Sequence, residues 1–145
     1  MELYLDPTRP IVLIDNSYFV FYRYHALMCW YKHRKEEPPS EPLKDHAFLT
    51  KFTQLFQGKT LELAKKAMAP LTNTVIAKDC ARKDIWRVER EPTYKEGRVT
   101  PSTFDGNIFP YVYDNVLPVM QENHKIHVMS VNTAEADDII GVIHQ

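Results

Sequence analysis

Three short apolar runs, each followed by acidic residues, mark the strands that the chain is expected to form. Residues 11–15 (IVLID) and 74–78 (TVIAK, with Asp79 next) are nearly continuous apolar runs, and residues 126–131 form a third. Such runs are typical of strands buried on both faces of a sheet. The intervening segments are much longer than a hairpin turn, which predicts parallel strands joined through helices.

The long segments between these runs have helical patterns. Residues 17–33 are dense in apolar and aromatic side chains, and Asn16 or Ser17 is placed to cap this helix. Residues 45–69 repeat apolar side chains at steps of three and four, with a break expected near Gly58.

A third helical pattern spans residues 104–123, where Pro118 predicts a kink or a boundary, and Asn132 is expected to open a last helix. Residues 32–42 and 80–101 are charged, and we expect loops there. The fold class predicted for the whole is α/β, a parallel sheet flanked by helices.

Acidic side chains follow all three expected strands. Asp15 ends the first, Asp79 follows the second, and Glu135, Asp137 and Asp138 lie just beyond the third. The carboxyl ends of parallel neighbours meet at one edge of the sheet, where sites form in such folds. Clustered carboxylates repel one another, and a hard cation that prefers oxygen ligands offsets this repulsion. The sequence therefore predicts a site for Mg²⁺ or Mn²⁺.

Helix capping is the alternative explanation for the third acidic cluster. Acids are favourable in the first turn of a helix, and Asn132-x-x-Glu135 has the form of a capping box. Capping needs one or two acids and does not account for Asp15 or Asp79, so the metal interpretation is preferred.

A basic and aromatic stretch follows Asp79. Cations beside aromatic rings suit a nucleic-acid backbone with stacked or frayed bases. Acidic residues in the same stretch reduce its net charge, so its position after Asp79 is the main argument for it. The residues concerned are Arg82, Lys83, Trp86, Arg87, Arg90, Tyr94, Lys95 and Arg98.

Composition excludes several other classes of protein. The net charge is −1, so binding to nucleic acid would need a local patch. With 4 glycines, the chain has neither a G-x-G-x-x-G motif nor a Walker A loop. Its 2 cysteines are interpreted as reduced thiols. No apolar run approaches the roughly 20 residues of a membrane span, so we expect an intracellular, soluble protein with no membrane partner.

Four motifs, in order along the chain, resemble the 5′-nuclease family, which includes the 5′-to-3′ exonuclease domain of bacterial DNA polymerase I, phage 5′ exonucleases and flap endonucleases. The opening IVLIDNSYFVFYRYHAL resembles the family's strand, Asp and aromatic helix. Asp79 with its basic residues, then Tyr94-Lys95 with Arg98, and finally NTAEADDIIG are similar to the motifs that follow.

The resemblance implies a PIN-like fold and a metal-dependent nuclease that acts on DNA with a 5′ end, flap or nick, in replication or repair. The metal ions would be bound by Asp15, Asp79, Glu135, Asp137 and Asp138. Arg82, Lys83 and Arg87 would hold the phosphate. Nucleic acid would also be contacted by Tyr24, His25, Tyr94, Lys95 and Arg98, although burial of Tyr24 and His25 in the aromatic helix is an equal expectation.

The chain also departs from the family pattern. Cys80-Ala81-Arg82 replaces a glycine-containing link and is one residue longer. The family continues beyond EADD into a strand with an Asp-x-Asp pair and then an element that grips DNA. Residues 1–145 are therefore expected to be the N-terminal part of the domain, incomplete at the C-terminus, with a second chain as a candidate source of the rest. Alone, the chain is expected to be weakly active or inactive.

Two alternatives to the 5′ nuclease stay open. One is a PIN-type ribonuclease, and the other is a non-catalytic, nuclease-like binding or scaffold subunit.

Overall fold

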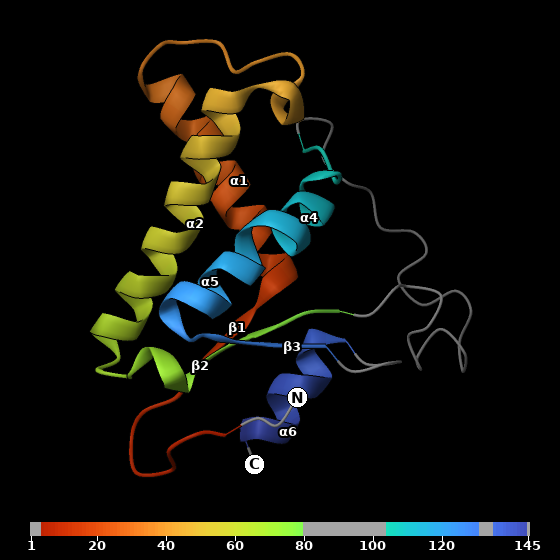
Figure 1. Ribbon diagram of the computed structural model, residues 1–145. Coiled ribbons are helices and arrows are strands. Elements are labelled where there is room, and N and C mark those ends of the chain that lie inside the picture. Colours follow the sequence, from red (N-terminus) through yellow and green to blue (C-terminus); the bar gives the residue numbers. More distant parts are fainter. Residues whose placement is uncertain (1–3, 80–103, 131–134, 145) are drawn as a thin grey trace, which may run out of the picture.

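Three strands form one parallel sheet in the order β1-β2-β3. They are β1 Val12–Asp15, β2 Thr74–Ala77 and β3 His127–Met129. The computed structural model describes residues 4–79, 104–130 and 135–144 (Figure 1). Every residue of the central strand β2 is buried, as its continuous apolar run predicted. The α/β class with a parallel sheet is confirmed.

Helices cover both faces of the sheet (Figure 1). One layer contains α1, α2, α4 and α5, and α6 lies on the opposite side, where it contacts β1 and β2. The described helices are α1 Asn16–His33, α2 His46–Lys66, α4 Ile108–Tyr111, α5 Leu117–His124 and α6 Ala136–His144, with short 3₁₀ turns at Pro42–Lys44 and Leu71–Asn73. A π-helical turn, η4 Val112–Val116, joins α4 to α5.

The main core lies between the sheet and the larger helical layer. Phe48, Phe52 and Phe56 repeat every four residues along α2 and are completely buried. The ring of Phe56 meets Phe19 of α1 edge-on, with ring centroids 4.9 Å apart. A smaller cluster on the other face joins Ala77 of β2 to the inner side of α6.

Two boundaries expected from the sequence were wrong. No break occurs at Gly58, because α2 continues from His46 to Lys66 and burial of its phenylalanines outweighs the weak helix propensity of one glycine. The third helical segment begins at Ile108 and not at residue 104, because the Asp105 carboxylate accepts the Asn107 N–H at 3.0 Å and forms a turn first. Pro118 is confirmed as a boundary, since it lies in the first turn of α5.

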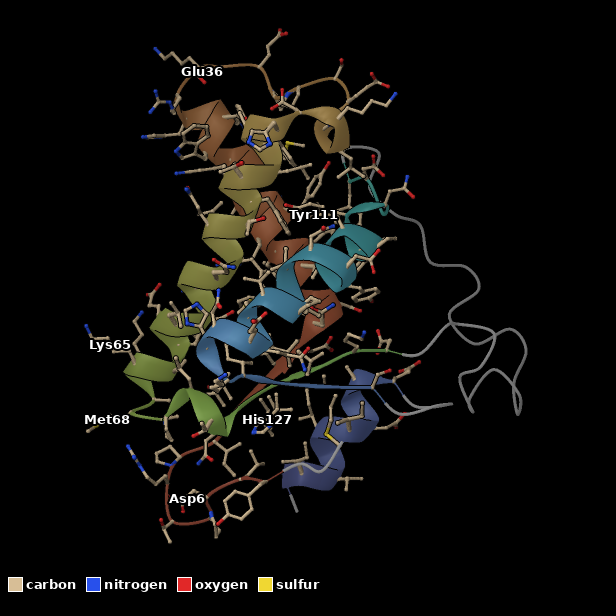
Figure 2. The ribbon with its side chains drawn as sticks, viewed as in Figure 1. Asp6, Glu36, Lys65, Met68, Tyr111 and His127 are labelled. Atoms are coloured by element: carbon tan, nitrogen blue, oxygen red, sulfur yellow. The ribbon has the colours of Figure 1, made fainter. Side chains whose placement is uncertain are left out.

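The N-terminal segment is fastened across the amino edge of the sheet, near Asp6 and His127 in Figure 2. Asn73 is 1% exposed, and its Oδ1 accepts the Asp6 N–H at 2.8 Å. Its Nδ2 donates to the carbonyls of Asp6 and Pro10, both at 3.0 Å. One buried amide thus holds residues 6–10 in place. Within the described ranges, no helix is both long and apolar enough to cross a bilayer.

Candidate active site at the carboxyl edge of the sheet

The carboxyl ends of the three strands meet at one edge, as the parallel arrangement requires. Asp15 is paired with Ala77, and Ala77 is paired in turn with Met129. The Lys78 N–H donates to the Met129 carbonyl at 2.8 Å and extends this alignment by one residue. Asp79 therefore follows directly beyond the edge where Asp15 ends β1.

Asp79 connects two helices that are far apart in the sequence. Its Oδ2 accepts the hydroxyl of Ser17, in the first turn of α1, at 2.8 Å. Its Oδ1 accepts the backbone N–H of Ala136, the first residue of α6, at 2.5 Å. These contacts span 62 and 57 residues of sequence. The geometry thus places the acid after β2 against both the start of α1 and the start of α6.

Asp15 caps α1, a role that the sequence pattern had assigned to Asn16 or Ser17. The Asp15 carboxylate accepts the Tyr18 N–H at 3.4 Å, and Asp15 has the extended backbone of an N-cap residue. A carboxylate at this position is stabilised by the unpaired N–H groups and the positive end of the helix dipole. Ser17 is instead used by Asp79.

The acids at the start of α6 have different surroundings. Glu135 is 4% exposed, and its N–H donates to Oδ2 of Asp138 at 2.9 Å. This bond is one half of a capping box, with Asp138 and not Glu135 as the N3 acid. The capping alternative therefore holds for Asp138, whereas Asn132 lies outside the described residues. The side chain of Asp137 is also outside the described part of the chain.

Three polar residues beside the site were not predicted. Asn16 is completely buried, and neither its Oδ1 nor its Nδ2 has a hydrogen-bond partner among the described residues. Burial raises the pKa of the Tyr113 phenol, the charge of Asp79 raises it further, and Asn16 partly offsets both. The Asn16 amide is near the Tyr113 hydroxyl but lacks hydrogen-bond geometry. The ammonium of Lys78 lies 4.5 Å from the centre of the Tyr113 ring.

No sequence signal distinguished these residues. Asn16 was considered only as a cap, and Tyr113 belongs to a helical pattern in which aromatic residues usually form the core. Lys78 ends an apolar run, where one polar residue is ordinary.

The described residues do not by themselves complete a metal centre. Among them, no group of three or more His, Cys, Asp or Glu side chains is arranged to hold a metal ion. The chemistry of the predicted donors still fits a hard cation, because they are all carboxylates and each oxygen can accept more than one interaction. Asp15 and Asp79 are the described acids at neighbouring strand ends.

The predicted phosphate and nucleic-acid contacts fall in two places. Arg82, Lys83, Arg87, Tyr94, Lys95 and Arg98 all lie outside the described residues, as does Cys80. Tyr24 is 2% exposed and packs edge-on against Phe48 and Phe104, which agrees with the expectation that it is buried.

His25 is exposed and borders a cavity of about 850 Å³ beside the 36–40 loop. Cys29, a free thiol, lies on the same wall, with its Sγ 3.6 Å from Nε2 of His25. In Figure 2 this region is near Glu36, at the end of α1 away from the sheet.

The comparisons with known proteins point to one family. Residues 10–145 match the family model described as 5′-3′ exonuclease, N-terminal resolvase-like domain. No curated protein and no solved structure matches the chain.

Proposed function

Because the chain belongs to the family of 5′-3′ exonuclease N-terminal resolvase-like domains, we propose that it takes part in hydrolysing phosphodiester bonds of DNA at a 5′ end, flap or nick. The proposed cofactor is Mg²⁺ or Mn²⁺. The observation that supports the proposal is the position of Asp79, which bonds to Ser17, two residues after Asp15, and to the N–H of Ala136, next to Glu135.

In this proposal the carboxylates bind the cation directly or through its waters. When bound, the cation would polarise the phosphodiester and supply an activated water. The chain's own contribution is to fix the carboxylates before the cation arrives. Ser17 and the Ala136 N–H orient Asp79, and the Tyr18 N–H orients Asp15. The proposed ligands are Asp15, Asp79, Glu135, Asp137 and Asp138.

Basic residues of the chain would hold the substrate. Arg82, Lys83 and Arg87 are proposed to steady the phosphate and the charge that develops on it. Tyr94, Lys95, Arg98 and His25 are proposed to contact the strand near the 5′ end. Tyr24 would act from its buried position by supporting the wall next to His25.

The test combines metal binding with cleavage. Mn²⁺ binding is measured by calorimetry, and cleavage of 5′-flapped and nicked duplexes is measured with Mg²⁺ or Mn²⁺, for the natural chain and for Asp15→Asn and Asp79→Asn. Both variants are expected to lose Mn²⁺ binding and any cleavage. The matched control is Asp45→Asn, because Asp45 is also an N-cap aspartate, accepting the Phe48 N–H at 2.8 Å on α2. Cleavage that survives Asp79→Asn refutes the assigned site.

A second candidate is a non-catalytic nucleic-acid-binding role. It is favoured by the engagement of both Asp79 oxygens in contacts within the protein, which gives this carboxylate a structural use independent of any metal. Tight DNA binding without Mn²⁺ binding or cleavage would select this role. Preference for RNA without a 5′ end would instead select a PIN-type ribonuclease.

A further inference from the structure

Lys78 extends from the carboxyl edge toward the larger helical layer. Successive side chains of a strand point to opposite faces, so Lys78 continues the side of Ile76 and Asp79 that of Ala77. Ile76 packs in the main core with α1, α2 and α5, whereas Ala77 packs against α6. Lys78 is thus the neighbour of a proposed metal ligand, on the other face of the sheet.

The Lys78 ammonium lies against an aromatic ring. Its Nζ is 4.5 Å from the centre of Tyr113, within the range of a cation–π interaction. Tyr113 is half-buried on the π-helical turn η4, which follows Tyr111 in Figure 2. Such turns inside helices are frequent at functional sites. The ring limits the positions open to a lysine side chain that would otherwise be mobile.

The charge of Lys78 is not neutralised by a described carboxylate. The ion pairs formed among the described residues involve Arg34, Lys44, Lys59 and Lys66. An ammonium held over a ring still has N–H donors available for another partner. The ring face attracts the positive charge, whereas carboxylate oxygens would accept hydrogen bonds from the three N–H groups.

An acidic edge that is to receive a phosphodiester needs such a cation. The carboxylates of Asp15 and Asp79 repel a phosphate until a metal or a basic group compensates them. Arg82, Lys83 and Arg87 were the candidates from the sequence, and Lys78 was not among them. Lys78 lies closer to Asp79 in sequence than any of these, and its side chain is already positioned.

We propose that Lys78, held against Tyr113, is a phosphate contact that positions a nucleic-acid phosphodiester at the carboxyl edge of the sheet. This inference rests on the proposed function, since it assumes that nucleic acid binds at this edge. Tyr113 is the positioning residue of the pair, through its ring and not through its hydroxyl.

The test measures DNA binding as a function of salt for Lys78→Ala, Tyr113→Leu and Tyr113→Phe. Removing one phosphate contact is expected to reduce the slope of log K against log salt by about 0.7 to 0.9, and to weaken binding about 3- to 10-fold near 0.1 M salt. Tyr113→Leu is expected to weaken binding less than Lys78→Ala, and Tyr113→Phe is expected to match the natural chain, because it keeps the ring.

Lys51 provides a matched control. Its Nζ lies 5.1 Å from the ring of Trp30, a lysine–aromatic pair of similar geometry. Trp30 is fourteen residues after Asn16 on α1, roughly 20 Å along the helix at 1.5 Å per residue. Lys51→Ala is expected to leave both the affinity and the salt slope unchanged. Circular dichroism melts of all variants separate loss of binding from loss of folding.

Replacing one phosphate of the DNA by an uncharged linkage tests whether Lys78 contacts that particular phosphate. With DNA that carries a methylphosphonate at the contacted position, Lys78→Ala should bind as tightly as the natural chain does. With ordinary DNA, Lys78→Arg should bind as tightly as the natural chain, because it keeps the positive charge. If the natural chain binds DNA but Lys78→Ala behaves like Lys51→Ala, the inference is wrong and the proposed function stands. If the natural chain binds no DNA, both are wrong.

Discussion

Replacing Asp79 by alanine should loosen α6 from the sheet. The substitution removes the hydrogen bonds from the Ser17 hydroxyl and from the Ala136 N–H. Hydrogen bonds to a charged group contribute about 1.5–3 kcal/mol each, and the lower figure applies because Asp79 is partly exposed, so we expect a loss of about 3 kcal/mol. The small cluster beneath α6 has few buried side chains to compensate.

Two further variants show how much of this loss of stability comes from each hydrogen bond of Asp79. In Asp79→Asn the amide oxygen still accepts the Ala136 N–H and the amide nitrogen can donate to Ser17, so we expect a loss of only about 1 kcal/mol. Ser17→Ala removes one of the two bonds, for a loss of about 1.5 kcal/mol. Combining Ser17→Ala with Asp79→Ala should cost no more than Asp79→Ala alone, because both remove the same interaction.

Hydrogen exchange measures the effect where it occurs. Because about 1.4 kcal/mol corresponds to a tenfold change in an equilibrium, protection of the Ala136 amide should fall by about 100-fold in Asp79→Ala and by less than tenfold in Asp79→Asn. Urea unfolding followed by circular dichroism gives the global free energy of unfolding. Asp45→Ala, which removes the cap of α2, should leave Ala136 exchange unchanged. Unaltered Ala136 protection in Asp79→Ala would refute the assigned role of the carboxylate.

Three other substitutions test the fold away from this edge. Gly58→Ala should raise the free energy of unfolding by about 0.5–1 kcal/mol, because the position is inside α2 and an added Cβ meets no atom within 4 Å; thermal unfolding would show it. Asn73→Ala should cost about 2–3 kcal/mol and speed proteolysis within residues 6–10, since it removes three short hydrogen bonds. Burial is the main reason why the pKa of Tyr24 is raised, and the charge of Asp105 adds to it. The stability that neutral Tyr24 contributes is therefore present below about pH 10 and is lost as the pH rises through the folded pKa. Tyr24→Phe should make the urea midpoint fall less steeply above that pH.

The strands and the parallel sheet could be predicted because their signals are local. A buried strand must be apolar at every position, and Thr74–Ala77 satisfies this rule without reference to the rest of the chain. The break predicted at Gly58 was wrong because helix propensity is a weak local term of about 1 kcal/mol. Packing of Phe52 and Phe56 against the sheet exceeds it, and packing is not a property of the local sequence.

The sequence predicted at which edge of the sheet the site lies, but not which residues contact its acids. Parallel pairing brings the ends of β1 and β2 to the same edge, with Asp15 opposite Ala77 and Asp79 two residues beyond it, whatever the helices do. The partners of Asp79 lie 62 and 57 residues away, and no spacing rule selects Ser17 or Ala136 from the other donors. Tyr113 was missed for the same reason, because its proximity to Asp79 depends on how the segment from α4 to α5 packs over the strand ends.

The hydrogen bonds at this edge give three of its acids partners within the protein. Three of the described carboxylates there accept a backbone N–H at the start of a helix: Asp15 from Tyr18, Asp79 from Ala136, and Asp138 from Glu135. Helix N-termini carry partial positive charge, so these donors offset part of the mutual repulsion that would otherwise oppose folding. The same donors fix the direction of each carboxylate, and a carboxylate oxygen has a second lone pair for another partner. Capping and metal binding are therefore compatible uses of one residue, and evidence for capping at Asp15 or Asp138 does not count against a cation site at the same edge.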